Sequence, residues 1–272
     1  YLTYVSIRSS NLDTTYAKET ETITVTFESS EPIQAPTVTI AGNNAIIATG
    51  QSGESLFTAT YIMTIDEDEE TIPFTLNYSD IAGNLGSEVV NSTSDASAVM
   101  YDKTDPTLSA VTMASSNADN SLSTVGDEIT LQITTENGPL KKPTITIAGN
   151  SITDISPEID GFNVYTATYE MGALDAATDP GESLSFTVDF SDLAGNDGTQ
   201  ITDLVNDDNG VEFDKEAPTF SSISIISDND PETALARVGD KITVSFVADE
   251  PIMTGTDPTV TIAGNTADVD RN

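Results

Sequence analysis

One seven-residue motif occurs three times in this chain and sets its period. The copies read Thr-Val-Thr-Ile-Ala-Gly-Asn or Thr-Ile-Thr-Ile-Ala-Gly-Asn and occupy residues 37–43, 144–150 and 259–265. Successive copies begin 107 and 115 residues apart. Solenoid repeats have periods of about 20–50 residues, whereas a β-sandwich domain takes about 100 residues. The sequence therefore predicts a tandem array of whole domains.

Two further segments recur in the same order and fix the boundaries of the array. Ser-Asp-(Ile/Leu)-Ala-Gly-Asn occupies residues 79–84 and 191–196, and (Tyr/Phe)-Asp-Lys-x-x-Pro-Thr occupies residues 101–107 and 213–219. Each segment returns after 112 residues. We therefore predict repeat 1 over 1–104, repeat 2 over 105–216, and an incomplete repeat 3, with strands A–C only, over 217–272.

Apolar residues alternate with Thr, Ser and Glu inside each repeat, as in Ile23, Val25 and Phe27. This period of two indicates half-buried strands, and Gly, Asn, Asp and Pro separate them as turns. In repeat 2 we predict strands over 107–114, 128–135, 143–148, 151–155, 162–171, 183–190 and within 199–214. Seven short antiparallel strands in such a length predict an all-β fold of immunoglobulin-like sandwiches, arranged as a linear rod.

Repeat 3 supplies only half of such a sandwich. Its inward set is predicted to be Ile223, Ile225, Ile242, Val244, Phe246, Val260 and Ile262. The strands that would cover these residues are missing from the repeat, and an open apolar face with free edges favours association. We expect completion either by more of the same chain or by a neighbouring copy, and in both cases head-to-tail assembly into a stalk or filament.

The composition excludes several classes of function. The chain has no Cys, His or Trp, so it has no disulfide, no common zinc, haem or iron–sulfur site, and no Ser-His-Asp or Cys-His machinery. With 9 Lys+Arg against 45 Asp+Glu, the net charge is −36, which makes nucleic acid and anionic membrane poor partners. No apolar run is long enough for membrane insertion.

The acidic side chains are instead candidates for calcium, a hard cation that prefers carboxylate and carbonyl oxygens. In this topology the chain entering a module, its B–C loop and its F–G loop share one pole, close to the acidic E–F loop of the preceding module. Like charges brought together there are costly without a cation between them. The predicted metal ligands are Asp102, Asp105, Glu136 and Asp192 at the first junction, and Asp214, Glu216, Asp249 and Glu250 at the second. The alternative is an acidic surface that is merely solvated.

Three other patterns have simpler explanations. Residues 206–210, Asn-Asp-Asp-Asn-Gly, resemble a calcium loop, but Val205 stands where the first ligand would be, so we predict a turn. Acid pairs could suggest a glycosidase, yet they recur in every repeat, and we predict no enzyme. Sequons at Asn77 and Asn91 are candidate glycosylation sites, although a chain so rich in Asn, Ser and Thr contains such triplets by chance.

The combined motifs resemble a known class of proteins. The Asp-Lys-Thr-x-Pro-Thr segment at 102–107, Glu31-Pro-Ile33, the recurring heptapeptide and Phe-Ser-Asp-Leu-Ala-Gly-Asn at 190–196 are similar to the Ig-like repeats of very large microbial surface proteins and adhesins. Repeat 2 departs from this pattern with Glu136-Asn-Gly-Pro-Leu140.

The resemblance implies a secreted, cell-surface, many-module stalk, often stiffened by calcium. Its partners would be copies of itself or further modules of the same chain, with glycans as another class. The alternative function is an adhesive module that binds carbohydrate or a partner protein. Such a module should carry one unusual aromatic-rich loop, and none stands out in the sequence.

Overall fold

The computed structural model describes residues 1–207, 210–252 and 258–270. The described residues form strands, turns and loops, and they divide into two compact units, Tyr1–Asp214 and Lys215–Asn272. The first unit contains two separate hydrophobic cores, one within Val5–Tyr101 and one within Val111–Phe213. We call the two halves of this unit module 1 (residues 1–104) and module 2 (residues 105–214), and residues 215–272 the C-terminal unit. The exact repeat boundaries, at residues 104 and 216, remain predictions.

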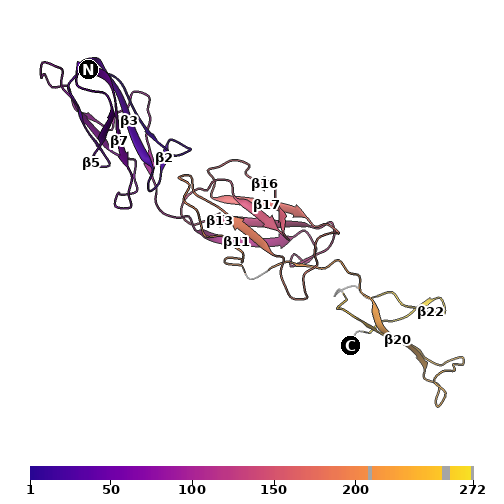
Figure 1. The fold of residues 1–272 in the computed structure, drawn as a ribbon. Helices are drawn as coiled ribbons and strands as arrows, with labels where there is room; N and C mark the ends of the chain where they lie inside the picture. The colour runs from indigo at the N-terminus through magenta and orange to yellow at the C-terminus, as the bar shows by residue number, and fades with distance from the viewer. Residues whose placement is uncertain (208–209, 253–257, 271–272) are drawn as a thin grey trace. The chain divides into compact units, whose positions relative to one another are not determined.

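Module 1 is an immunoglobulin-like sandwich of two four-stranded sheets with the orders β1-β3-β7-β6 and β5-β4-β8-β9 (Figure 1). These orders are the A-B-E-D and C′-C-F-G sheets of that fold. Its strands are β1 Leu2–Ser9, β2 Tyr16–Ala17, β3 Thr22–Ile33, β4 Thr37–Ile40, β5 Asn43–Asn44, β6 Ile46–Thr49, β7 Glu54–Ile62, β8 Phe74–Asn77, β9 Val89–Val90 and β10 Met100–Tyr101.

Module 2 repeats this arrangement with sheets β11-β13-β17-β16 and β15-β14-β18. Its strands are β11 Leu108–Ser115, β12 Leu122–Ser123, β13 Glu128–Thr135, β14 Thr144–Ile147, β15 Asn150–Ser151, β16 Ile155–Ser156, β17 Val164–Glu170, β18 Phe186–Asp189 and β19 Glu212–Phe213. The predicted all-β sandwich fold is therefore confirmed, and most strand positions agree to within a few residues.

One predicted strand of module 2 was wrong, and another is much shorter than the segment that was expected to contain it. The strand expected over 151–155 is two strands, because β15 turns back on β14 whereas β16 pairs with β17. The strand predicted within 199–214 is the short β19 near the end of that segment, and the residues before it make isolated bridges. Ile201 bridges to Val188, Val205 bridges to Val111, and β19 pairs with β12. This segment therefore crosses between strands of both sheets, and residues 208 and 209 of the turn expected at 206–210 lie outside the described residues.

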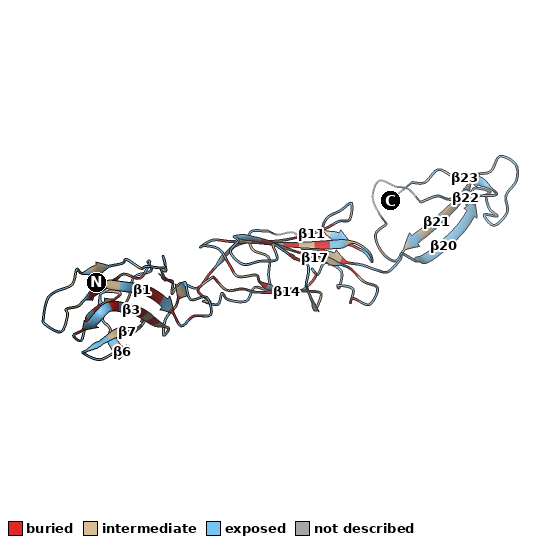
Figure 2. Cartoon of the chain, turned by 90° about the horizontal axis from the view of Figure 1, so that it is seen from above, coloured by how far each residue is buried: buried red, intermediate tan, exposed pale blue. Residues whose placement is uncertain are grey.

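Alternating residues of the long strands build each core. In β3 the side chains of Ile23, Val25 and Phe27 are fully buried, while the Thr residues between them and Glu28 after them are more exposed. Figure 2 shows this alternation of red with lighter colours along β3 and β11. Phe27 stacks on Phe57 of β7, with ring centroids 5.5 Å apart. Burial of such apolar side chains supplies most of the stabilisation of a thin sandwich.

The last strand of each module runs parallel to its second strand. β10 pairs with β2, and the Met100 and Asp102 amides donate to the Thr15 and Ala17 carbonyls at 2.8 and 2.9 Å. In module 2, β19 pairs with β12, and the Glu212 and Asp214 amides donate to Ser121 and Ser123 at 2.9 and 3.0 Å. Tyr101 and Phe213 anchor these closing strands in the two cores.

The C-terminal unit holds β20 Phe220–Ser227 paired with β21 Ile242–Ala248, and β22 Thr261–Ile262 paired with β23 Asn265–Thr266. These strands correspond to A, B, C and C′ of the complete modules. Among residues 210–252 and 258–270, no strand covers the free edge of β21. In the part of the chain that the structure describes, no helix is long and apolar enough to cross a membrane.

Candidate functional site at the contact between modules 1 and 2

The Ser-Asp-Leu-Ala-Gly-Asn loop of module 2 closes on itself through its aspartate. Asp192 accepts hydrogen bonds from the Gly195 amide at 2.6 Å, the Asn196 amide at 2.9 Å and the Asn196 side chain at 2.8 Å. Gly195 has a φ of +89°, a conformation that glycine adopts without the steric cost of a side chain. The conserved spacing within the motif thus makes a compact turn whose carbonyls point outward.

Those carbonyls are bound by module 1. Asn11 Nδ2 donates to the Ala194 carbonyl at 2.7 Å, and Lys18 Nζ donates to the Gly195 carbonyl. In return, Asn196 Nδ2 donates to the Asp102 carbonyl at 3.1 Å. Asp192, Ala194 and Asn196 are buried in this contact. Because buried polar groups need partners, the three hydrogen bonds define where the two modules meet.

Acidic and basic side chains are mixed at this contact. Burial raises the pKa of the Asp102 carboxyl, and the negative charges of Asp192 and Glu69 raise it further, while the Thr104 amide lowers it. Lys18 and Lys141 both approach Gly195, whose added Cβ would stand 3.7 and 3.1 Å from their ammonium nitrogens. Two positive groups of the chain itself therefore lie at the same contact as these acids, and sequence reasoning missed them.

A third lysine secures the linker between the modules. Lys103 Nζ donates to the carbonyls of Ile65 at 2.6 Å and Glu67 at 2.7 Å. The Lys103 amide and the Thr104 hydroxyl both donate to Glu69, at 2.9 and 2.6 Å, and these bonds lower the pKa of Glu69. The linker is thus tied to the acidic loop of module 1.

The structure places the four predicted ligands of the first junction in two sets. Asp102 and Asp192 lie close enough for their charges to interact. Glu136 accepts from the Thr107 hydroxyl at 3.2 Å, and the Asp105 carbonyl accepts from Asn137 at 3.2 Å. Within residues 1–207, 210–252 and 258–270, no three acidic side chains gather as a metal site. Calcium at this junction stays a prediction.

The ligands predicted for the second junction belong to different units. Asp214 ends the first unit, whereas Glu216, Asp249 and Glu250 belong to the C-terminal unit. Asp249 accepts from the Thr219 amide at 2.7 Å and from the Thr219 hydroxyl at 2.5 Å. These bonds lower the pKa of Asp249 and give it a local structural role. Metal binding by this group also stays a prediction.

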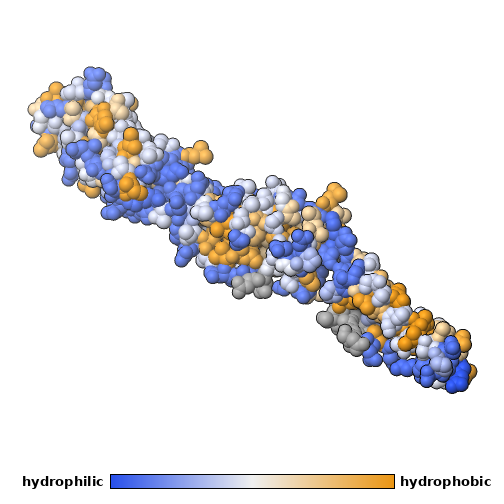
Figure 3. Space-filling model, turned by 60° about the horizontal axis from the view of Figure 1, so that its bottom comes forward, coloured by the Kyte–Doolittle hydropathy of each residue, from blue (hydrophilic) through white to orange (hydrophobic). Residues whose placement is uncertain are grey.

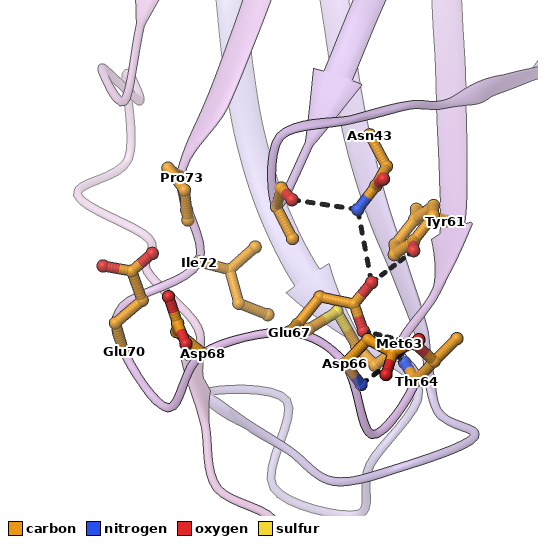
Figure 4. A pocket seen from close by; sticks show the side chains of 11 residues that line it. Asn43, Tyr61, Met63, Thr64, Asp66, Glu67, Asp68, Glu70, Ile72 and Pro73 are labelled. Atoms are coloured by element: carbon orange, nitrogen blue, oxygen red, sulfur yellow. Dashed lines mark hydrogen bonds between the residues drawn. The ribbon is translucent and has the colours of Figure 1, made fainter.

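The acidic loop at 66–70 of module 1 lines a pocket of about 510 Å³, shown in Figure 4. Glu67 is its best-connected acid: it accepts from the Thr64 amide at 2.7 Å, from the Asn43 side chain at 3.2 Å, and from the Tyr61 hydroxyl. Burial raises the pKa of Glu67, but the hydrogen bonds from Tyr61 and Thr64 outweigh this effect, and the net pKa is lowered. The hydrogen bond between Tyr61 and Glu67 is in turn the main cause that raises the pKa of Tyr61 to about 12.

Module 2 repeats this arrangement with an aspartate. Asp175 accepts from the Tyr169 hydroxyl at 3.0 Å, the Gly172 amide at 2.7 Å and the Asn150 side chain at 3.0 Å. Asn43 and Asn150 are the last residues of the recurring heptapeptide. In both modules the heptapeptide asparagine thus connects its turn to the acidic E–F loop. One acid in each loop, Glu67 or Asp175, therefore has a structural role.

The two sequon asparagines differ in their surroundings. Asn77 is exposed at the end of β8, and its side chain donates to Glu88 at 3.0 Å. Asn91 has a φ of +52° and accepts from the Phe74 amide at 2.7 Å, so its side chain holds β8 in place. Glycosylation of both residues stays a prediction.

No protein-family model matches this chain, and no curated protein matches it significantly. Similar solved structures include fibronectin(III)-like modules of CbhA from Clostridium thermocellum, with 10% identity, 76% of this chain and 94% of that chain covered, and a TM-score of 0.35. The structure of Rst D1-D2 has 11% identity, covers 77% and 100%, and has a TM-score of 0.32. SGBP-B of the Bacteroides ovatus mixed-linkage glucan utilization locus, solved in complex with a mixed-linkage heptasaccharide, has 13% identity, with 82% of this chain and 50% of that chain covered, and a TM-score of 0.20. Likenesses this distant carry no functional argument.

Proposed function

We propose that this chain is a tension-bearing segment of an extracellular, surface-attached stalk or filament built from tandem immunoglobulin-like modules. The observation that carries the proposal is the parallel pairing of the second and last strands in both modules. When a chain is pulled from its two ends, the second strand of a module is drawn toward the N-terminus and the last strand toward the C-terminus. In a parallel pair the pulling force acts along the strands and shears all the hydrogen bonds between them at once. The bonds therefore do not open one by one.

The contact between the modules supports the same role. Three hydrogen bonds join the 191–196 loop to module 1, and Lys103 ties the linker to the acidic loop. A linker without such contacts would leave its two modules free to move independently. Calcium stiffening is a separable part of the proposal, because the lysine and asparagine contacts do not require it.

Single-molecule pulling of the full chain tests this role. Unfolding of modules 1 and 2 should appear as separate events, each releasing about 35 nm of contour length for ~100 residues. Met100→Pro removes an amide donor of the β2–β10 pair, so we expect the unfolding force of module 1 to fall. Module 2 serves as the internal control, and Glu212→Pro should reverse the pattern.

Two results would contradict the proposal. One is an unfolding force of module 1 that does not change on Met100→Pro while the module remains folded at zero force. The other is selective binding to one oligosaccharide on a glycan array, lost with a change in a single module, which would favour the adhesive alternative.

A further inference from the structure

The C-terminal unit exposes apolar side chains that its counterparts bury. Ile223 and Ile225 of β20 correspond to Val5 and Ile7 in module 1, by their equal registers with the neighbouring strand. The module 1 pair is 5% and 2% exposed, whereas Ile223 and Ile225 are 65% and 64% exposed. Figure 2 shows β20 in the colour of exposed residues, and Figure 3 shows hydrophobic side chains gathered on this unit.

A groove of about 690 Å³ lies along β21 and the β22–β23 hairpin. Its lining includes Ile242, Val244 and Phe246 of β21, together with Val260 and Ile262. These residues belong to the inward set predicted from the sequence. One edge of β21 pairs with β20, and its other edge has no strand among the described residues. An edge of this kind binds extended segments by strand addition.

Modules 1 and 2 show what covers the same edge. In module 1, Ile23, Val25 and Phe27 of β3 stand opposite Tyr61, Ala59 and Phe57 of β7. In module 2 the β13 side chains stand opposite the equivalent residues of β17, in the pairs Ile129–Tyr169, Leu131–Ala167 and Ile133–Tyr165. Both covering strands thus place an aromatic, an alanine and an aromatic residue inward, with threonines between them.

We propose that the free edge of β21 binds one extended peptide segment of this type, antiparallel, with its alanine opposite Val244 and its aromatic residues opposite Ile242 and Phe246. Phe246 occupies the position of Phe27, which stacks on Phe57 in module 1. A segment with phenylalanine at that place therefore fits the groove best. Alanine in the middle is needed because both modules bury it completely between larger residues.

Charge favours a short neutral segment over a second copy of the chain. Two copies meeting face to face would each bring a net charge of −36, and such like charge opposes association. The covering strand of module 1 from Ser55 to Ile62 carries no charged side chain. The proposal does not depend on the tension-bearing role of modules 1 and 2.

The test uses the full chain and a synthetic peptide of residues 54–62, Glu-Ser-Leu-Phe-Thr-Ala-Thr-Tyr-Ile. Two peptide variants with equal charge are matched: Ala59→Lys changes the inward face and Thr58→Lys the outward face. We expect the native and Thr58→Lys peptides to bind and to slow amide exchange across residues 242–248 of the chain. The Ala59→Lys peptide should bind at least tenfold more weakly, since burying a charge without a partner is costly.

Each alternative outcome overturns the proposal. Equal binding of all three peptides would mean non-specific adhesion, and absence of binding would mean that the edge does not accept this segment. Sedimentation of the chain as a dimer that the native peptide does not dissociate would show that a second copy covers the face. Slower exchange in β3 or β13, without any change in β21, would place the peptide elsewhere.

Discussion

The same Asp-x-Ala-Gly-Asn turn occurs in modules 1 and 2, but its surroundings differ. In module 1, Asp80 accepts from the Asn84 amide at 2.8 Å and from its side chain at 2.7 Å, so the turn is closed as in module 2. Residues 81–84 are nevertheless exposed, whereas Asp192, Ala194 and Asn196 are buried. The internal hydrogen bonds build the turn, and the neighbouring module decides whether it becomes an interface.

The residues beside each turn make this difference. Lys141 approaches Gly195 in module 2, and the corresponding position in module 1 is Gln34, whose side chain donates to Ile81 at 3.4 Å. Asn11 and Lys18 then supply donors from the other side of the contact. A motif that is identical in two modules thus serves as a plain turn in one and as a docking loop in the other.

The largest expected effect is a difference in stability loss between two matched substitutions, one in each turn. Asn196→Ala removes a side chain that bonds both Asp192 and the Asp102 carbonyl, and it leaves buried acceptors unpaired. We expect a loss of about 2–3 kcal/mol in the free energy of unfolding of module 2. Asn84→Ala breaks the same internal bond at an exposed turn and should cost module 1 about 1 kcal/mol or less. Equal losses in chemical denaturation would remove the distinction between the turns.

A smaller effect concerns the charge at the contact. The folded-state pKa of Asp102 lies above its ordinary value of 3.8, mainly because the carboxyl is partly buried. Ionisation therefore costs stability, a cost that is absent below pH 3.8 and fully present above the raised pKa. Asp102→Asn should then stabilise the folded chain at pH 7 in the presence of a chelator, by less than about 1 kcal/mol because water screens the half-buried group. At pH 3 the substitution should have no effect.

In the presence of calcium, we predict the opposite effect of Asp102→Asn on stability. If calcium binds Asp102 as the sequence argument predicts, the wild-type chain should melt at a higher temperature with the metal than with chelator. Asp102→Asn should then destabilise the chain when calcium is present. A variant that is stabilised equally with and without calcium would rule out Asp102 as a ligand.

Sequence periodicity was enough to predict the strands, because β13 and β17 alternate apolar and polar residues without interruption. It could not fix the bounds of the strand within 199–214, where Ile201, Val205 and Phe213 contact three different strands, because single bridges leave no period to detect. Of the four acids that loop order grouped at the first junction, Asp102 and Asp192 lie close enough for their charges to interact, and Asp105 and Glu136 have other partners.

The lysines at the junction were missed, although one signal was available. Only 9 Lys and Arg residues occur in the chain, and Lys18, Lys103 and Lys141 all lie at this contact. The scarcity of cations makes such a grouping informative. Repulsion between the acids suggested only a metal ion between them. Sequence patterns cannot show which lysines from distant parts of the chain lie near a given loop.

The most direct test of the docked loop is the distribution of distances between spin labels on the two modules. The chain has no cysteine, so Leu85→Cys and Leu174→Cys, at residues 88% and 100% exposed, give unique labelling sites. We predict a narrow distribution for the otherwise native chain and a clearly broader one after Asn11→Ala and Lys18→Ala remove the donors to Ala194 and Gly195. A distribution equally broad in both proteins would contradict the claim that this loop holds module 2 against module 1.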